Sequence, residues 1–117
     1  MRKFYYLSTC STCKRIMKEI ELPKNFELQD IKTERLCENK LNEIIALSGS
    51  VESLFSKRSM KYRSMGLHEV ELTDFEMKNL ILEEYTFLKR PVAIVDDEIF
   101  IGNSKKVVEA LKTKIHS

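Results

Sequence analysis

Apolar and polar residues along the first third of the chain are arranged in a pattern that predicts a β–α–β unit. Residues 3–7 are mostly aromatic or aliphatic, which indicates a short strand. Residues 11–20 have helical periodicity, and Pro23 ends the helix. The apolar positions of this helix are Ile16, Met17 and Ile20. Residues 26–31 alternate apolar and polar side chains, as in a half-buried strand. Two strands joined in this way usually pack in parallel, with a right-handed crossover.

The middle of the chain is predicted to be helical. Residues 39–47 carry an apolar stripe that ends at the Ser-Gly-Ser of residues 48–50, and residues 51–55 indicate a further short helical piece. Residues 73–76 match a capping box, which predicts a helix that runs to about Glu84. The side chains expected on the buried face of that helix are Phe75, Leu80 and Ile81.

The last part of the chain returns to strands. Residues 91–95 and 98–101 are apolar runs separated only by two aspartates. Strands joined by so short a turn form an antiparallel hairpin. Residues 102–104 then cap a final helix. Its expected core positions are Val107, Val108 and Leu111. The order of elements is therefore β-α-β, helices, β-β-α, which predicts an α/β fold with a mixed sheet.

Composition narrows the class of protein. The length of 117 residues fits one domain, and 43% hydrophobic with 32% charged residues is unlike a disordered or fibrous chain. The net charge of +2 argues against direct nucleic-acid binding, so the basic stretch 57–63 is interpreted first as a solvated edge. No apolar run reaches the roughly 18 residues of a membrane span. We therefore expect a cytoplasmic monomer without membrane contact.

Cys10 and Cys13 form a Cys-x-x-Cys pair where the first strand leads into the first helix. At a helix N-terminus, free N–H groups and the helix dipole stabilise a thiolate and lower its pKa. Lys14 and Arg15 add positive charge nearby. Structural disulfides are rare in the cytosol, which favours a reactive pair. In that interpretation Cys10 is the nucleophile and Cys13 the resolving thiol.

Two other interpretations of the pair remain. Zinc would need two further ligands from Cys37, His68 and His116, which show no paired spacing, and His116 is expected in a frayed tail. Alternatively, both cysteines are simply buried structural residues. The strand-to-helix context favours the redox interpretation. Cys37 is expected to be a helix-start or surface thiol.

Arg90 and Pro91 open the first strand of the predicted hairpin. Proline cannot donate a hydrogen bond within a sheet, so it is normal at the start of a strand, and Arg90 would then be solvated. The other interpretation makes Pro91 a cis residue beside the Cys10 loop, with the Arg90 guanidinium directed towards the thiolate or a bound oxyanion. The sequence leaves both open.

Several motifs in this order resemble the arsenate reductase (glutaredoxin-type) family and its Spx-like relatives. They are Cys10-x-x-Cys13, Asp30-Ile31-Lys32, Leu54-Phe55-Ser56-Lys57-Arg58, Lys61-Tyr62-Arg63-Ser64-Met65-Gly66-Leu67, Lys89-Arg90-Pro91-Val92 and Ile101-Gly102. The resemblance implies one domain with a thioredoxin-like fold, its core formed by residues 1–35 and 86–117 and a helical insertion at 36–85.

The resemblance also implies roles for particular residues. Cys10 matches the catalytic cysteine, and Arg90 matches the arginine before the cis-proline that helps to bind the oxyanion. Arg58 lies in the segment that supplies another substrate-binding arginine. Arsenate or a disulfide would be the substrate, with electrons from glutathione and glutaredoxin or from thioredoxin, and no bound cofactor or metal is expected.

The chain also departs from the arsenate reductase pattern. Ser8-Thr9 replaces the Asn-Pro that often precedes the cysteine, and a third arginine is missing near Gly102-Asn103, where Lys105 is the nearest cation. The Cys-x-x-Cys pair is the Spx-like pattern. Two functions follow: a thiol–disulfide oxidoreductase that includes arsenate among its candidate substrates, or a redox-sensing regulator that binds RNA polymerase.

Overall fold

The computed structural model describes residues 2–117, which divide into two compact units. The first comprises the chain up to Glu34 together with Arg90–Ser117, and the second is Arg35–Lys89. In chain order the elements are β1 (Arg2–Tyr6), α1 (Ser11–Glu19), β2 (Glu27–Asp30), α2 (Glu38–Ser48), η1 (Glu52–Leu54), α3 (Met60–Ser64), η2 (Leu67–Glu69), α4 (Asp74–Glu83), η3 (Tyr85–Phe87), β3 (Val92–Val95), β4 (Glu98–Ile101) and α5 (Lys105–Ile115), where η marks a 3₁₀ helix.

The first unit is built on a four-stranded sheet in the order β2-β1-β3-β4. β1 and β2 are parallel, whereas β1 pairs with β3, and β3 with β4, in antiparallel fashion. The parallel β–α–β unit and the hairpin expected from the sequence are thus both confirmed. The hairpin turns at Asp96, whose φ of 61° is left-handed. This mixed sheet with its helices is the thioredoxin-like α/β fold that the resemblance implies.

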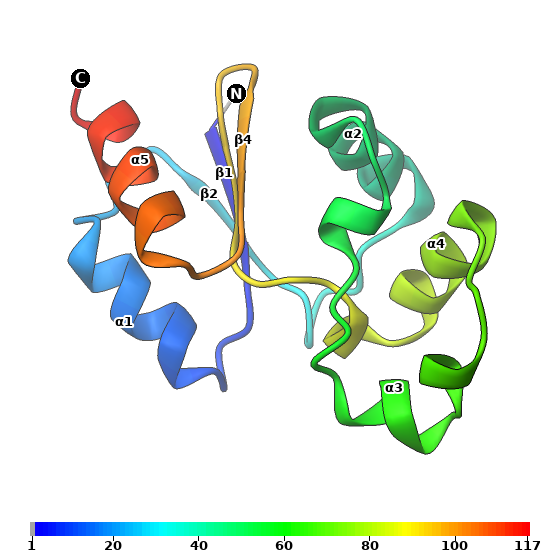
Figure 1. The fold of residues 1–117 in the computed structure, drawn as a ribbon. Coiled ribbons are helices and arrows are strands. Elements are labelled where there is room, and N and C mark those ends of the chain that lie inside the picture. Colours follow the sequence, from blue (N-terminus) through cyan, green and yellow to red (C-terminus); the bar gives the residue numbers. More distant parts are fainter. Residues whose placement is uncertain (1) are drawn as a thin grey trace. The chain divides into compact units, whose positions relative to one another are not determined.

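Helices α1 and α5 lie together on one face of this sheet (Figure 1). Side chains from both helices and from β1 and β3 make one hydrophobic core. Its buried members are Phe4, Ile16, Ile20, Phe26, Ala93, Val95, Val108, Leu111 and Ile115. Because Cys10 immediately precedes α1, the packing of this helix on the sheet fixes the position of the cysteine pair. The core residues of α5 are Val108, Leu111 and Ile115. Val107, which the sequence predicted in the core, is only partly buried.

The end of α5 is anchored, which corrects the expectation that His116 lies in a frayed tail. The helix continues to Ile115, which is buried in the core. The His116 ring nitrogen Nε2 lies 2.8 Å from the carbonyl oxygen of Ile20. The C-terminal turn is therefore held against the end of α1. No helix in residues 2–117 is both long and apolar enough to cross a membrane.

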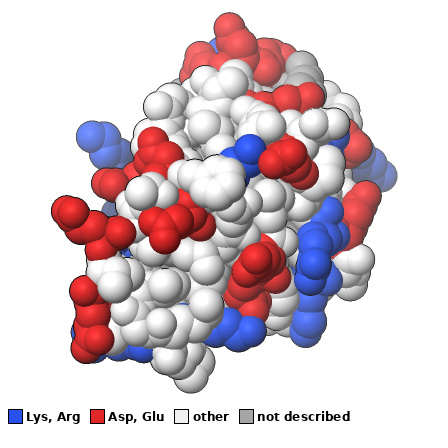
Figure 2. Space-filling view, turned by 90° about the vertical axis from the view of Figure 1, so that its right-hand side faces the viewer, with Lys and Arg blue, Asp and Glu red and all other residues white. Residues whose placement is uncertain are grey.

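The second unit contains α2 and α4, whose ends the sequence predicted closely. The capping box of α4 is present: Glu76 N–H donates to the Thr73 hydroxyl at 3.1 Å, and Thr73 N–H donates to the Glu76 carboxylate at 3.0 Å. The face seen in Figure 2 shows carboxylates scattered over uncharged surface, with Lys and Arg side chains towards its right and lower edges.

Phe75 corrects the predicted buried face of α4. Its side chain is 73% exposed, while Met77 and Ile81 are buried. Residues four apart share one face of a helix, whereas Phe75 stands two positions before Met77, about 200° around the axis. The buried stripe of α4 therefore runs through Met77 and Ile81, and Phe75 points away from it.

The short helix α3 was not predicted. Ser59 caps it by accepting a hydrogen bond from Lys61 N–H at 3.3 Å. The Ser59 and Thr86 hydroxyls are 2.7 Å apart, and Lys61 forms an ion pair with Glu84. These contacts join α3 to the residues around η3, so this five-residue helix depends on partners far along the chain.

Candidate functional site

Cys10 is the N-cap residue of α1. Its backbone is extended, with φ −92° and ψ 114°, and its side chain makes no capping hydrogen bond. Its own N–H donates to the Leu7 carbonyl at 3.0 Å, and its carbonyl accepts from Lys14 N–H at 3.2 Å. The first turn of α1 contains no acidic residue. The position of Cys10 at the helix N-terminus, predicted from the sequence, is confirmed. Free N–H groups at such a position favour a thiolate.

The two cysteines have different surroundings. Cys10 is partly exposed, whereas Cys13, one turn into the helix, is fully buried. Both thiols are free in the structure. The first of the pair is therefore open to a reaction partner, and the second is accessible only from within the protein.

The pKa of Cys10 is lowered from its ordinary value of 9.0, as the balance of opposing effects. Partial burial is the largest single effect and acts to raise this pKa. It is outweighed by hydrogen bonds from the Cys13 N–H, the Cys13 thiol and the Thr12 N–H, and by attraction to the Arg90 guanidinium. The free N–H groups of the first helical turn thus stabilise the Cys10 thiolate.

The pKa of Cys13 is shifted in the opposite direction. Burial, as the largest cause, together with the nearby charge of Cys10 raises the pKa of Cys13 to about 11, although Arg90 opposes the rise. Two thiols one helical turn apart therefore ionise in a fixed order, Cys10 first. This order distinguishes the pair chemically, since the thiolate is the nucleophilic form of cysteine.

Arg90 is far along the sequence from the cysteine pair, but its charge acts on the Cys10 thiolate. Its peptide bond to Pro91 is cis, and Gly102 N–H donates to the Pro91 carbonyl at 2.9 Å. Among the residues that the structure describes, the guanidinium nitrogen Nη1 of Arg90 is a buried atom with no hydrogen-bond partner. A buried, unpaired cationic donor is unfavourable until an acceptor reaches it. An anion beside Cys10 would supply that acceptor.

The other sequence-predicted residues belong to other elements of the chain. Arg58 belongs to the second unit, is exposed, and donates its N–H to the Ser56 hydroxyl at 3.4 Å. Lys105 is the exposed first residue of α5. Cys37 is an exposed thiol at the N-cap of α2, as predicted. Within residues 2–117, no three His, Cys, Asp or Glu side chains gather into a group that could hold a metal ion.

Sequence reasoning did not assign a role to Asp30, although it is part of the Asp-Ile-Lys motif. Its carboxylate accepts hydrogen bonds from Ser8 N–H at 3.3 Å and from Lys32 N–H at 3.1 Å. Ser8 lies in the loop that leads to Cys10. A carboxylate at the carboxyl end of a strand parallel to β1 was the signal that could have identified it.

The fold and the site define a thioredoxin-like protein with a dithiol at the start of its first helix. A model of the ArsC family matches residues 5–111, and the chain belongs to this family. It is a thiol-based, oxidoreductase-like member of this family. The match covers both units of the chain, which confirms the resemblance drawn from its motifs.

Individual relatives are more distant. The chain is 22% identical over 114 residues to Regulatory protein MgsR of Bacillus subtilis (strain 168), a match that covers 95% of this chain and 90% of that protein. The solution structure of SACOL0876 from Staphylococcus aureus COL is 31% identical, with a TM-score of 0.75 over 94% of this chain and 97% of that one. A possible arsenate reductase from Streptococcus mutans UA159 is 26% identical, with a TM-score of 0.71 over 95% and 97%.

Proposed function

We propose that the protein is a thiol-dependent oxidoreductase in which the Cys10 thiolate is the nucleophile and Cys13 is the resolving thiol. The observation that carries the proposal is the opposite shift of the two pKa values: that of Cys10 is lowered, and that of Cys13 is raised to about 11. The partly exposed sulfur of Cys10 therefore ionises first, while the buried sulfur of Cys13 keeps its proton until Cys10 has reacted.

With a disulfide substrate, the Cys10 thiolate attacks one sulfur and forms a mixed disulfide, and the first substrate thiolate departs. Cys13 then loses its proton and attacks the Cys10 sulfur, which releases the second substrate thiolate and forms the Cys10–Cys13 disulfide. The Cys13 proton passes to solvent, and two electrons pass from the dithiol to the substrate. Glutathione with glutaredoxin, or thioredoxin, would return two electrons and restore both thiols.

Arsenate is the oxyanion that the family resemblance implies. Its two-electron reduction to arsenite removes one oxygen, which leaves as water with two protons. The unpaired Arg90 Nη1 supports an anionic substrate, because a guanidinium offers donors that match oxyanion geometry. Arg58 is the second cation that we assign to substrate binding, on the resemblance of its segment alone. Lys105 is the cation nearest in sequence to Gly102-Asn103, where the third arginine is missing.

The direct test is the pH dependence of Cys10 alkylation in Cys13→Ser, with mass spectrometry of the oxidised wild type. We expect an alkylation midpoint below 9.0, and a loss of two hydrogens upon oxidation that Cys10→Ser abolishes. Turnover of arsenate or of a small disulfide is then measured with each electron donor. A midpoint at the ordinary value without disulfide formation contradicts the proposal.

A second function is favoured by the similarity to Regulatory protein MgsR and by the Cys-x-x-Cys pattern. In this case the Cys10–Cys13 disulfide would act as a switch in a Spx-like regulator that binds RNA polymerase. The same oxidation would occur, but without turnover. Capture of purified RNA polymerase by one redox state, lost in Cys10→Ser, supports the regulator. Turnover that Cys10→Ser abolishes, with no polymerase bound in either state, supports the enzyme.

A further inference from the structure

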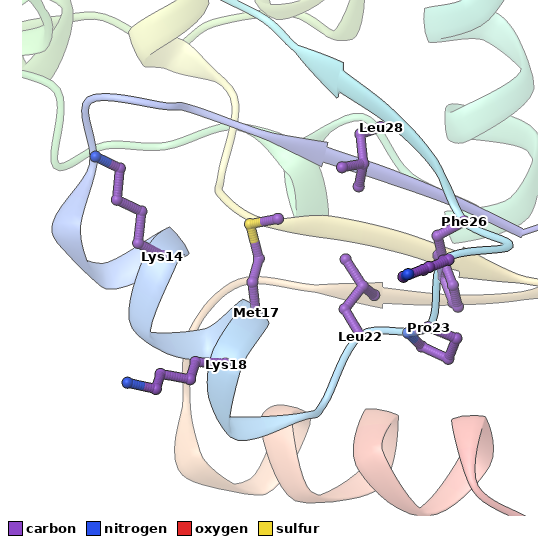
Figure 3. A pocket seen from close by; sticks show the side chains of 8 residues that line it. Lys14, Met17, Lys18, Leu22, Pro23, Phe26 and Leu28 are labelled. Carbon is purple, nitrogen blue, oxygen red and sulfur yellow. The ribbon is translucent and has the colours of Figure 1, made fainter.

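A second feature of the first unit lies along α1, outside the cysteine pair. An open groove of about 470 Å³ runs between α1 and β2. Its lining residues are Lys14, Met17, Lys18, Leu22, Pro23, Lys24, Phe26 and Leu28. In Figure 3 the Met17, Leu22 and Leu28 side chains point into the space between the helix and the strand, while Lys14 and Lys18 extend outward from α1, away from that space.

The groove exists because the helices do not cover the edge of the sheet. Phe4 on β1 and Leu28 on β2 are directly opposite in register, so both point to the face on which α1 lies. Phe4 is completely buried, but Leu28 remains 46% exposed. β2 is an outer strand of the sheet. An apolar side chain of this edge strand is thus left partly in water beside α1.

The charged side chains that line the groove are all positive. Three lysines border the groove and no carboxylate lines it. Within the part of the chain that the structure describes, none of these three ammonium groups has an ion-pair partner, whereas Lys3 and Lys114 of the same unit are paired with Glu27 and Glu98. A ligand with carboxylates would complement this rim.

We propose that this groove binds an acidic segment of a partner protein, with a bulky apolar side chain that enters beside Met17 and Leu28. The apolar floor calls for such a side chain, since a small inorganic anion would leave it uncovered. The concave shape favours a protruding chain over a lipid surface, which binds apolar groups that project from a protein. The carboxylates of the segment lie beside Lys14, Lys18 and Lys24.

The location of the groove gives this binding a consequence. Lys14 is one turn after Cys10 on the same helix, and its N–H donates to the Cys10 carbonyl at 3.2 Å. A segment held in the groove therefore follows the helix that begins at the dithiol. The groove would select which protein approaches Cys10. Binding itself needs no cysteine chemistry, so it is measured independently of the function proposed above.

The test is a selection of random displayed peptides of roughly a dozen residues on the reduced full-length chain, counter-selected on Lys14→Glu/Lys18→Glu/Lys24→Glu. We expect recovered peptides that combine Asp or Glu with Leu, Phe or Met. The strongest is synthesised and titrated against the wild type. Its affinity should fall about tenfold or more in the triple variant and severalfold in Leu28→Ser. Retention of the affinity in the triple variant contradicts the proposal.

The matched control is Lys105→Glu/Lys106→Glu/Lys112→Glu, which reverses three exposed lysines of α5 that do not line the groove. It should change the affinity by less than about twofold at physiological salt. Lys14→Gln/Lys18→Gln/Lys24→Gln repeats the test without added negative charge and is checked for folding by circular dichroism. Selected peptides without acidic residues, equal loss in the α5 control, lysine-dependent self-association, or lysine-dependent binding to anionic vesicles in place of peptide would each overturn the proposal.

Discussion

The carboxylate of Asp30 at the end of β2 accepts a hydrogen bond from the backbone N–H of Ser8 at 3.3 Å. The Ser8 side chain, as the largest cause, and the N–H groups of Lys32 and Ser8 hold the pKa of Asp30 below its ordinary value. Ser8 is two residues before Cys10, whose N–H closes a turn onto the Leu7 carbonyl. The Asp30 side chain therefore connects the loop before the dithiol to the neighbouring strand.

We expect Asp30→Ala to slow alkylation of Cys10 at neutral pH by about twofold to fivefold, because a loosened loop presents the helix N–H groups to the sulfur less well. The variant is made in Cys13→Ser, and its alkylation rate is followed against pH. Asp30→Asn keeps an acceptor for the Ser8 N–H and should retain most of the rate. Equal pH midpoints in all three proteins would show that the Asp30 contact has no effect on the thiolate.

Arg90 is expected to act on Cys10 through its charge. Arg90→Met should raise the pKa of Cys10 and slow its alkylation at neutral pH by about twofold to fivefold, whereas Arg90→Lys should do less. Arsenate or phosphate should protect Cys10 of the wild type from alkylation, and this protection should be lost in Arg90→Met. Undiminished protection in Arg90→Met would exclude Arg90 as an anion ligand.

Arg90→Met should not lower the free energy of unfolding by more than about 0.5 kcal/mol, since it removes a buried donor that has no partner within residues 2–117. Urea unfolding measures this. A loss of several kcal/mol would mean that the guanidinium makes a stabilising contact in the folded protein. This measurement separates an effect on reactivity from an effect on folding.

The free energy of unfolding should rise with pH below 9.0, the ordinary cysteine pKa, because of Cys10, and fall with pH above 9.0 because of Cys13. Below it, Cys10 loses its proton more readily in the folded state, so stability rises as the pH approaches 9.0. Between 9.0 and about 11, folded Cys13 keeps a proton that the unfolded chain has released, so stability falls, by on the order of 1–3 kcal/mol.

Urea unfolding in reducing buffer from neutral to alkaline pH checks both slopes. Cys10→Ser should abolish the rise, and Cys13→Ser should abolish the fall. Slopes are compared instead of absolute stabilities, because each serine also changes packing. If Cys13→Ser keeps the alkaline decrease, another group is responsible for it.

Truncation of two side chains on α4 should change the free energy of unfolding by very different amounts. Ile81 is 3% exposed, so Ile81→Ala should lower the free energy of unfolding by about 2–5 kcal/mol. Phe75 is 73% exposed, so Phe75→Ser should change it by less than about 0.5 kcal/mol. Comparable losses in chemical denaturation would mean that Phe75 is covered in solution.

Features that depend on residues close in sequence could be predicted. The hairpin follows from a turn of two aspartates, and the start of α4 follows from Thr73 and Glu76, which hydrogen-bond each other. The place of Cys10 at the start of α1 follows in the same way, since an apolar strand leads directly into a helical pattern. Each of these features is fixed by interactions within a few residues.

Features that depend on distant contacts could not be predicted. α3 has five residues and no buried side chain, so its sequence carries no apolar periodicity. It is held instead by Thr86 and Glu84. Within residues 2–117, Arg90 Nη1 has no hydrogen-bond partner because of the way other residues pack around the guanidinium. No local sequence pattern predicts that packing. The contact from Asp30 to Ser8 spans 22 positions and needs the parallel pairing of β1 and β2.

The complete burial of Cys13 bears on how a Cys10–Cys13 disulfide would be opened again. An incoming thiolate can reach only the Cys10 sulfur, so the sulfur of Cys13 has to be the leaving group. Thiol–disulfide exchange is slower when the departing sulfur has a high pKa, and burial acts to raise the pKa of Cys13. Once formed, the oxidised state would thus be reduced slowly without a dedicated donor, and would outlast the oxidant that produced it.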